Sequence, residues 1–365
     1  MTYRPKTTID DVARRAGVSL ATVSRALRGL PHVRPEMRAR VEQAALELHY
    51  VADGNAARLA SGRSRTVGLI APLLTIWYTS QIIAGVEDVL QAAGYDVLIS
   101  ALSSVEHRRK LIQGRLVFQQ RVDGVILVDV FFGREGARKL QVDLPVILAG
   151  ESVEGLPSLG IDNRRGAQLA AEHLAGLGHE RVAIVGGMTP HARYSPVPAL
   201  RREGFRAVCE EHNVTVTGES DGHFTTAGGH HCLGAILHQR RPPTALFCFS
   251  DEMAFGVLQA ARELGVRVPD DIAVVGFDDH PTAEAMGLTT VRQPVRDIGR
   301  RSAERVLMAI DDPKPERQHE TIPVELVVRE STVGRRAPSA EMSHANASDR
   351  DVTPTGGVAL KRFPS

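Results

Sequence analysis

Residues 7–30, TTIDDVARRAGVSLATVSRALRGL, constrain the fold more than any other stretch of this 365-residue chain. Apolar residues recur at positions 9, 12, 13 and 16, which is the spacing of one face of a helix. Gly17 follows this run, and glycine readily takes the left-handed conformation that ends many helices. Ser19 can then cap a second helix running from Leu20 to about Arg28. The stretch therefore predicts two short helices joined by a tight turn.

The charge distribution distinguishes this segment from the rest of the chain. Residues 1–65 hold 12 lysines and arginines against 6 acidic residues, a net charge of +6, whereas the remaining residues hold 32 against 37, a net charge of −5. A basic end on a mildly acidic body is typical of a protein that meets nucleic-acid phosphates. We interpret the pair as a DNA-reading helix-turn-helix, whose second helix enters the major groove. An ordinary helical hairpin is the alternative that the helix pattern alone allows.

Two further segments complete the N-terminal part of the chain. Pro35 suits a first helical turn, and the apolar residues after it form a stripe that predicts a third helix, so that residues 1–50 make a three-helix DNA-binding domain. Residues 51–65, VADGNAARLASGRSR, are small, polar and basic except for Leu59, and are expected to form a hinge. A helical turn over residues 55–60 would need DNA or a partner chain to hold it. The alternative is a flexible tether whose leucine touches the body.

Short apolar runs alternate with helical stretches from Thr66 onward. Such alternation predicts parallel sheets with helices on both faces, and the number of units favours two lobes. The tail, residues 337–365, is rich in Ser, Pro, Asp and Gly and is interpreted as disordered. Strands are expected at 67–71, 95–100, 124–128, 146–149, 182–185, 245–249, 272–275 and 322–329, and helices at 80–93, 106–120, 163–177, 200–212, 226–237, 251–264 and 295–310.

Several features argue against other classes of protein. Cys209, Cys232 and Cys248 lack metal-like spacing and are expected to be buried, reduced thiols. No apolar run resembles a signal peptide or approaches a membrane span, so we expect a cytoplasmic protein without a membrane partner. The histidines His223, His230 and His231 are interpreted as a solvated helix face rather than a metal site. Neither a metal nor a cofactor is expected.

Separated segments of the chain resemble the lactose-repressor (LacI/GalR) family of bacterial transcriptional regulators. They are IDDVARRAGVSLATVSRALRG, Leu59 in the hinge, AGLGHERVAIVGG, FSDEMAFGVLQAARELGVRVPDDIAVVGFDD, LTTVRQPV and IPVELVVREST. The resemblance implies an α + α/β protein: a three-helix helix-turn-helix head and two doubly wound parallel-sheet lobes of the periplasmic-binding-protein type. The body would span residues 66–336, with lobe one at 66–162 and 293–320 and lobe two at 163–292 and 321–336.

The resemblance also implies a function. It indicates a sequence-specific DNA-binding repressor that binds a palindromic operator as a homodimer and is controlled by a small effector, a sugar or sugar derivative, between its lobes. The tail has no leucine heptad, which favours a dimer over a tetramer. Two alternatives are an enzyme and a periplasmic sugar-binding protein. Against an enzyme, the first strand is not followed by a dinucleotide-binding glycine motif, and no P-loop motif occurs in the sequence. Against a periplasmic sugar-binding protein, the chain carries a basic helical head.

The resemblance assigns roles within the head and hinge. Arg25 has the fork geometry to bind guanine, whereas small polar groups and backbone amides would hold phosphates. The paired Leu59 side chains would wedge into the minor groove at the operator centre. Base edges are expected to face Leu20, Ala21 and Arg25, and phosphates to face Ser19, Thr22 and Ser24.

Five residues are expected to bind the effector: Trp77, Tyr78, Arg201, Ser250 and Asp278. An aromatic ring against a sugar face together with converging polar groups suits a small-molecule pocket. For three of these residues a structural role is an open alternative: an ion pair between lobes for Arg201, loop packing for Trp77, and a helix cap for Ser250. Asp251 is expected to cap the helix that follows it.

The chain departs from the family pattern at several positions. Arg34 stands where the family usually has a serine cap, and Ala52 and Asp53 replace a common Pro–Asn pair. Gly150 stands where members often carry a hydroxyl-binding aspartate, although Glu151 is adjacent. The last departure leaves the identity of the sugar open.

Overall fold

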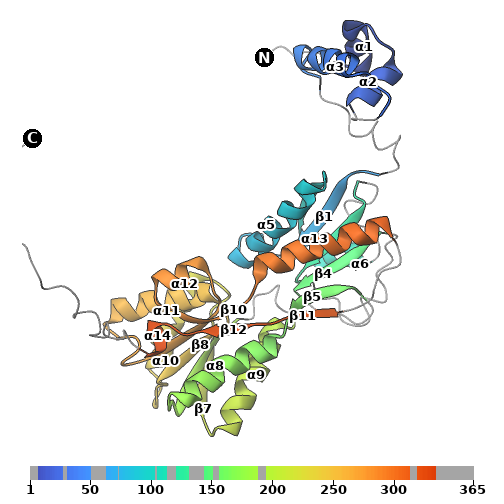
Figure 1. Cartoon of the computed structure of the whole chain (residues 1–365). Coiled ribbons are helices and arrows are strands. Elements are labelled where there is room, and N and C mark those ends of the chain that lie inside the picture. The colour runs from blue at the N-terminus through green and yellow to red at the C-terminus, as the bar shows by residue number, and fades with distance from the viewer. Residues whose placement is uncertain are drawn as a thin grey trace, which may run out of the picture.

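The computed structural model consists of a helical head and a two-lobed body (Figure 1). The residues that it describes are 7–27, 31–50, 63–72, 74–102, 105–112, 121–130, 144–150, 156–187, 195–312 and 319–333. Leu59, most of the predicted hinge and the predicted tail lie outside these residues. Within the described part of the chain, no helix is both long and apolar enough to cross a membrane.

Three helices form the head: α1 (Ile9–Ala16), α2 (Leu20–Leu27) and α3 (Pro35–Glu47). Thr8 and Asp11 form a capping box at the start of α1, and Gly17 ends that helix with a φ of 64°. Fully buried valines from all three helices make the small core, namely Val12, Val23 and Val41.

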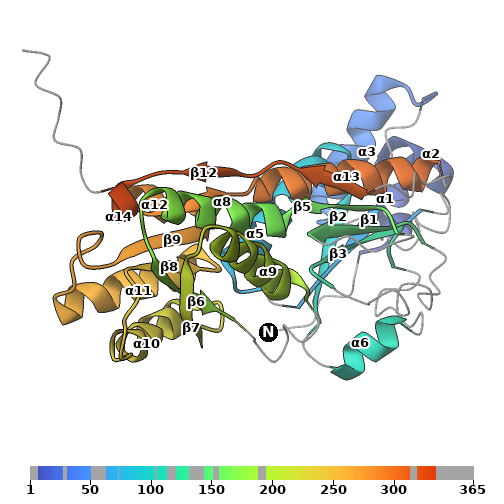
Figure 2. The ribbon, with the colours of Figure 1, turned by 90° about the horizontal axis from the view of Figure 1, so that it is seen from below.

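The lobe-one sheet has the strand order β11-β5-β4-β3-β1-β2, and all of its neighbouring strands are parallel. Apolar residues point to both faces: Leu69 packs in the same cluster as α5 and α13, whereas Ile70 packs with Leu111 of α6. Figure 2 shows α6 on the opposite side of the sheet from α13. The elements are β1 (Thr66–Ala71), α5 (Trp77–Ala92), β2 (Asp96–Ala101), α6 (Val105–Ile112), β3 (Gly124–Val128), β4 (Val146–Gly150), β5 (Ser158–Ile161), α13 (Val295–Asp311) and β11 (His319–Ile322).

The lobe-two sheet has the order β12-β10-β9-β8-β6-β7, parallel except for β12, which runs antiparallel to β10. Strands buried on both faces fill its centre, as parallel sheets require. The elements are α8 (Asn163–Gly176), β6 (Arg181–Gly186), α9 (Val197–Glu211), β7 (Thr215–Asp221), α10 (Thr226–Leu237), β8 (Ala245–Cys248), α11 (Asp251–Leu264), β9 (Ala273–Asp278), α12 (Pro281–Ala285), β10 (Thr289–Arg292), β12 (Glu325–Val327) and α14 (Glu330–Val333).

The chain crosses between the lobes three times, after β5, after β10 and after β11. The prediction of one last strand at 322–329 is wrong, because β11 belongs to the lobe-one sheet and β12 to the lobe-two sheet. Pro323 stands at this crossing, and proline has no N–H to continue a ladder. The other predicted strands and helices are present, with shifts of up to a few residues at their ends. Residues 113–120 of the helix predicted at 106–120 lie outside the described residues, and strands β5, β7 and β10 were not predicted. The predicted fold class is confirmed.

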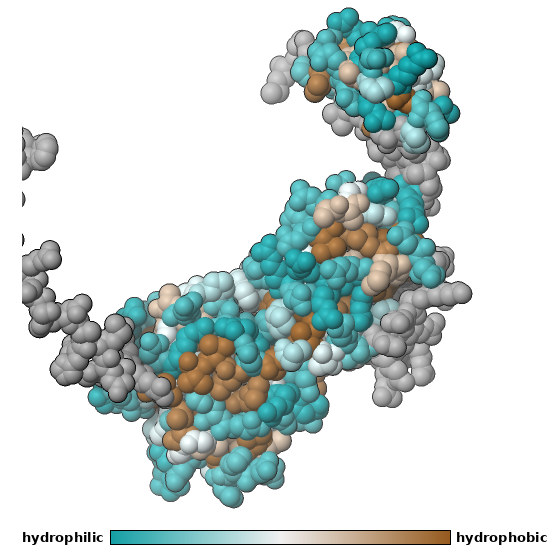
Figure 3. Space-filling view, viewed as in Figure 1, coloured by the Kyte–Doolittle hydropathy of each residue, from teal (hydrophilic) through white to brown (hydrophobic). Residues whose placement is uncertain are grey.

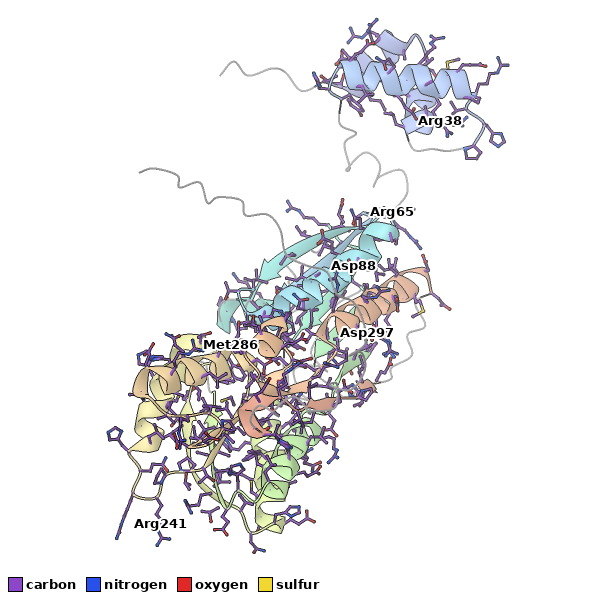
Figure 4. The ribbon with its side chains drawn as sticks, turned by 60° about the vertical axis from the view of Figure 1, so that its left-hand side comes forward. Arg38, Arg65, Asp88, Arg241, Met286 and Asp297 are labelled. Carbon is purple, nitrogen blue, oxygen red and sulfur yellow. The ribbon has the colours of Figure 1, made fainter. Side chains whose placement is uncertain are left out.

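Helices α5 and α13 pack at backbone distance. A Cβ added to Gly85 of α5 would lie 2.1 Å from the carbonyl oxygen of Arg296 of α13, so only glycine permits this approach. Arg296 also forms an ion pair with Asp88 of α5, 2.9 Å apart. Figure 4 shows the labelled Asp88 on α5 and Asp297 on the neighbouring α13. The close contact joins the first segment of lobe one to the segment that returns from lobe two.

Candidate DNA-binding head and effector cavity

Helix α2 presents one face to solvent and buries the other. Val23 and Ala26 are buried in the core of the head, whereas Ala21 and Arg25 are exposed and Leu20 is 45% exposed. An exposed leucine of this size in a domain with a small core is available for contact with another molecule. The residues predicted to face base edges therefore share an accessible surface.

Two hydroxyl side chains, those of Ser19 and Thr22, lie at the N-terminus of α2. Ser19 Oγ accepts a hydrogen bond from the backbone N–H of Thr22 at 3.2 Å and lies 2.9 Å from Thr22 Oγ1, so Ser19 caps the helix. Ser24 is half-buried on the same helix. At the start of α3, Arg34 makes no side-chain cap, which matches the departure seen in the sequence. The helix N-terminus and its two hydroxyls suit phosphate contacts.

The arginines of the head differ in their partners. Arg15 of α1 forms an ion pair with Glu47 at 2.5 Å, and Arg14 pairs with Asp11. Among the described residues, Arg25 has no acidic partner within ion-pair distance. Figure 3 shows that hydrophilic residues cover most of the visible surface of the head. Arg25 is thus a solvent-facing cation that can meet an external acceptor.

A cavity of about 110 Å³ lies between the two lobes, at the carboxyl ends of the strands of both sheets. Ligands of open α/β sheets bind at these ends, because loops there leave a crevice. Each contributing residue ends or follows a strand, or lies on a helix that starts beside one. The polar and aromatic groups of the wall include Tyr78, Asp129 and Gly150 from lobe one and Arg201, Ser250 and Asp278 from lobe two.

Four of the five predicted effector residues line this one cavity: Tyr78, Arg201, Ser250 and Asp278. Trp77 is not part of its wall. The ring of Trp77 instead lies against His280, with 4.9 Å between the ring centroids. Since Trp77 begins α5 of lobe one and His280 follows β9 of lobe two, this contact joins the lobes beside the cavity. Its position fits the packing alternative.

Arg201 of α9 is only 4% exposed and is held from three directions. Its Nε donates to Asn163 Oδ1 at 2.9 Å, and its Nη1 donates to the carbonyl of Phe249. Its guanidinium carbon lies 3.5 Å from the centre of the Phe277 ring, a cation–π contact. Burial lowers the pKa of Arg201, and the charge of Asp278 opposes this effect. The guanidinium is thus presented to the cavity in one fixed orientation.

Asp278 ends β9 in a backbone conformation that side chains rarely adopt, with a φ of 130°, and Asp279 follows at 55°. Such conformations cost about 1–3 kcal/mol and persist where the surroundings impose them. Gln293 Nε2 donates to Asp278 Oδ1 at 2.5 Å, and Arg329 pairs with Asp279 at 2.7 Å. Burial raises the pKa of the Asp278 carboxyl, whereas Arg201 favours its charged form. Asp278 lines the cavity from this strained backbone position, with its carboxyl held by Gln293.

Ser250 has both of the roles considered for it. Its Oγ accepts a hydrogen bond from the backbone N–H of Met253 at 3.3 Å, so it caps α11 while lining the cavity. The expectation that Asp251 is the cap is wrong. The buried Asp251 accepts hydrogen bonds from Thr290 Oγ1 at 2.6 Å and from the backbone N–H of His280 at 2.8 Å. Burial raises its pKa to about 6, and it ties α11 to β9 and β10.

The cavity residues that were not predicted include Asn163, Gln293 and Asp129. Asn163 and Gln293 lie at crossings between the lobes, and neither periodicity nor strand ends mark them as residues of a cavity. Asp129 had a signal, because it directly follows the buried strand GVILV and so stands at a carboxyl end. Glu151, which could have replaced the side chain missing at position 150, lies outside the described residues.

The histidines and cysteines have ordinary structural surroundings. His230 Nε2 lies 2.7 Å from Glu263 Oε2, and both side chains are partly accessible to solvent. Across the described ranges, no group of three or more metal-ligating side chains occurs. The three cysteines are buried and unpaired with one another, as expected, and burial raises the pKa of the Cys209 thiol to about 11.

Gly150 lies so close to Asp129 and Tyr78 in the cavity wall that no side chain fits at position 150. Its φ is 98°, and an added Cβ would lie 2.1 Å from Asp129 Oδ1 and 2.7 Å from the Tyr78 hydroxyl. We expect Gly150→Ala to lower the free energy of unfolding by about 1–3 kcal/mol, because the strained φ and the clash act together. The measurement is urea unfolding. Gly176→Ala, at a helical position with open space around it, is the control; equal stability losses would contradict the argument.

Known protein families match both parts of this chain. The family described as "Bacterial regulatory proteins, lacI family" matches residues 8–53, and the "Periplasmic binding protein-like domain" matches residues 171–332. The ribose operon repressor of Halalkalibacterium halodurans is 34% identical over 90% of this chain and 98% of its own length. The chain belongs to the lacI family of bacterial regulatory proteins. As a lacI-family member, it is a DNA-binding transcriptional regulator.

Other members of the family agree with this assignment. The repressor PurR of Vibrio vulnificus is 32% identical over 89% of this chain and 98% of its own length. The structure of the Lac repressor dimer bound to operator and the anti-inducer ONPF superposes with a TM-score of 0.79 at 29% identity, covering 90% of this chain and 99% of that one. This lacI-family fold thus includes the helix-turn-helix head together with lobes of the periplasmic-binding-protein type.

Proposed function

We propose that this lacI-family regulator is a repressor that binds a palindromic operator as a homodimer. It would act in the cytoplasm, where the chromosomal DNA lies. A small, sugar-like effector that binds in the cavity between the lobes would control it. The observation that carries the proposal is one cavity that collects Arg201, Ser250 and Asp278 from lobe two and Tyr78 from lobe one. The Lac repressor, a relative in fold, is described as a dimer bound to operator. Residue roles within the head are proposed on the same basis.

The regulatory step proposed is a shift between two arrangements of the lobes. An effector that contacts both lobes favours the arrangement in which those contacts fit, and it can shift the equilibrium only by its difference in affinity for the two states. The Trp77–His280 contact between the lobes would change with the same movement. In a dimer, rotation of the first lobes would alter the distance between the two hinges and so the fit of both heads on DNA.

The experiment that tests the proposal combines ligand and DNA binding. The purified protein is screened by thermal shift against sugars, polyols and nucleosides, and each ligand that raises Tm is added to gel shifts with DNA from upstream of the neighbouring genes. We expect a dimer in solution, a preference for specific duplex over random competitor, and a change in DNA affinity with the ligand. A monomer without any preference for a duplex would refute the proposal.

We also infer that the cavity binds its ligand without converting it, since the relatives are named as regulators. A ligand that raises Tm should be recovered chemically unchanged after long incubation with the protein. Recovery of a product at a rate proportional to protein concentration would show an enzyme instead.

Leu59→Ala tests the wedge proposed for the hinge. We expect the affinity for a specific operator to fall about ten-fold, because the bend that lets both heads contact DNA would no longer be supported. Weak, salt-sensitive binding to random DNA should survive, since it rests on charge. Gel shifts at two salt concentrations separate the two kinds of binding. An equal loss of both would argue against a wedge.

A further inference from the structure

Asp129 occupies the end of β3 at the cavity wall, and one of its oxygens lacks a partner. Oδ1 is shielded from solvent, and nothing in the described part of the chain forms a hydrogen bond with it. Burial raises the pKa of the Asp129 carboxyl to about 7, and Arg201 opposes this effect. Buried polar atoms are satisfied in the great majority of cases, so an exception at a cavity wall points to a missing partner.

The glycine at position 150 makes room for this carboxyl. A Cβ at Gly150 would lie 2.1 Å from Asp129 Oδ1, so the oxygen fills the space that a side chain at the end of β4 would use. At this point of the cavity wall, the carboxyl group therefore belongs to Asp129, after β3, and not to a side chain at position 150 of β4. The two positions are adjacent because β3 and β4 pair in register, with Val128 opposite Ala149.

The charged groups of the cavity wall are mostly acidic. Asp129, Glu252 and Asp278 bring three carboxyl groups, against the single guanidinium of Arg201. Arg201 already donates to Asn163 and to the carbonyl of Phe249, so part of its donor capacity is used within the protein. A ligand that brings donors would satisfy these acceptors. A phosphate or carboxylate on the ligand would instead lie against these carboxyl oxygens in a poorly solvated site, which costs free energy.

We propose that Asp129 binds the effector by accepting a hydrogen bond from a ligand hydroxyl or amine, and that the cavity selects uncharged polyols or amine-bearing ligands over phosphorylated and carboxylated ones. The proposal rests on the proposed function and specifies the ligand chemistry of the same cavity. Asp129 would then decide whether the cavity binds the uncharged, amine-bearing, phosphorylated or carboxylated form of the same sugar. The Asp129 carboxyl, held in the space beside Gly150, is the group of this subsite that contacts the ligand.

The experiment compares charged and uncharged derivatives within each of three skeletons. Isothermal titration measures binding of glucose, glucosamine, glucose 6-phosphate and gluconate, of ribose and ribose 5-phosphate, and of adenosine and its monophosphate. We expect binding only from uncharged or amine-bearing members. Tighter binding of a phosphorylated or carboxylated ligand than of its uncharged parent would overturn this proposal about ligand chemistry. If that charged ligand also changed the affinity for DNA, the proposed function as an effector-controlled regulator would still be supported.

Variants test the residue itself with the ligand that binds. Asp129→Asn keeps the shape but replaces one acceptor oxygen and the charge, and we expect an affinity about ten-fold lower, the typical loss of a hydrogen bond to a charged group. Asp129→Ser, smaller and uncharged, should lose at least as much, and far-ultraviolet circular dichroism checks the fold of both. Asp270→Asn, on an exposed turn with 66% of its side chain accessible, should bind like wild type. Unchanged affinity in both Asp129 variants would overturn the role of Asp129.

Discussion

Arg25→Ala is expected to weaken operator binding by about 2–6 kcal/mol in a dimer, because each of two heads loses one base contact of about 1–3 kcal/mol. The physical reason is the position of Arg25 on the exposed face of α2, where no acidic neighbour among the described residues competes for its guanidinium. Discrimination should fall at one base pair of each half-site, while the rest of the recognition pattern persists. Gel shifts with an operator series mutated at single positions measure both effects.

Two further variants separate charge from geometry. Arg25→Lys keeps the positive charge but lacks the planar fork, so we expect it to retain part of the affinity and lose the base preference. Arg241→Ala removes the same charge at the far tip of lobe two, where Figure 4 shows Arg241 remote from the head marked by Arg38. That control should bind operator like wild type. Unchanged affinity and unchanged base preference in Arg25→Ala would show that α2 does not read the operator through this residue.

Asp278→Ala is expected to abolish the effector response, with ligand affinity falling by roughly 3–5 kcal/mol. Removal of this carboxyl takes away a ligand acceptor and leaves the buried cation of Arg201 without the acidic group that most favours its charged form. DNA affinity measured without ligand should stay close to that of wild type, because the head is untouched. Titration of ligand and gel shifts with and without it give the two readouts.

The control for Asp278 must separate binding from folding. Asp278→Asn keeps the size of the side chain and its hydrogen-bonding capacity toward Gln293, so it should be folded while responding weakly. Asp270→Ala removes a carboxylate from an exposed turn and should respond normally. A normal response in both Asp278 variants would remove this residue from the effector site, although the cavity and the head could still serve the proposed regulator.

Much of the fold could be predicted because its signals are local. Gly17 and Ser19 mark a helix stop and a helix start that depend on backbone geometry within a few residues, and the structure has both where expected. The central strands were recognisable because parallel strands buried on both faces need unbroken apolar runs, as in GVILV before Asp129. Edge strand β7, TVTGESD, lacks such a run since it is only partly covered, and it was not predicted.

The head, the alternation of strands and helices, and the family could be predicted from the chain alone, because capping, periodicity and motif spacing are properties of neighbouring residues. The tertiary structure was needed to show what the cavity contains. It assigned β11 and β12 to different sheets, moved Trp77 from the predicted wall to the contact with His280, and brought Asp129 against Gly150. These outcomes depend on which strand ends become neighbours, and that is set by sheet order and packing between segments far apart in the chain.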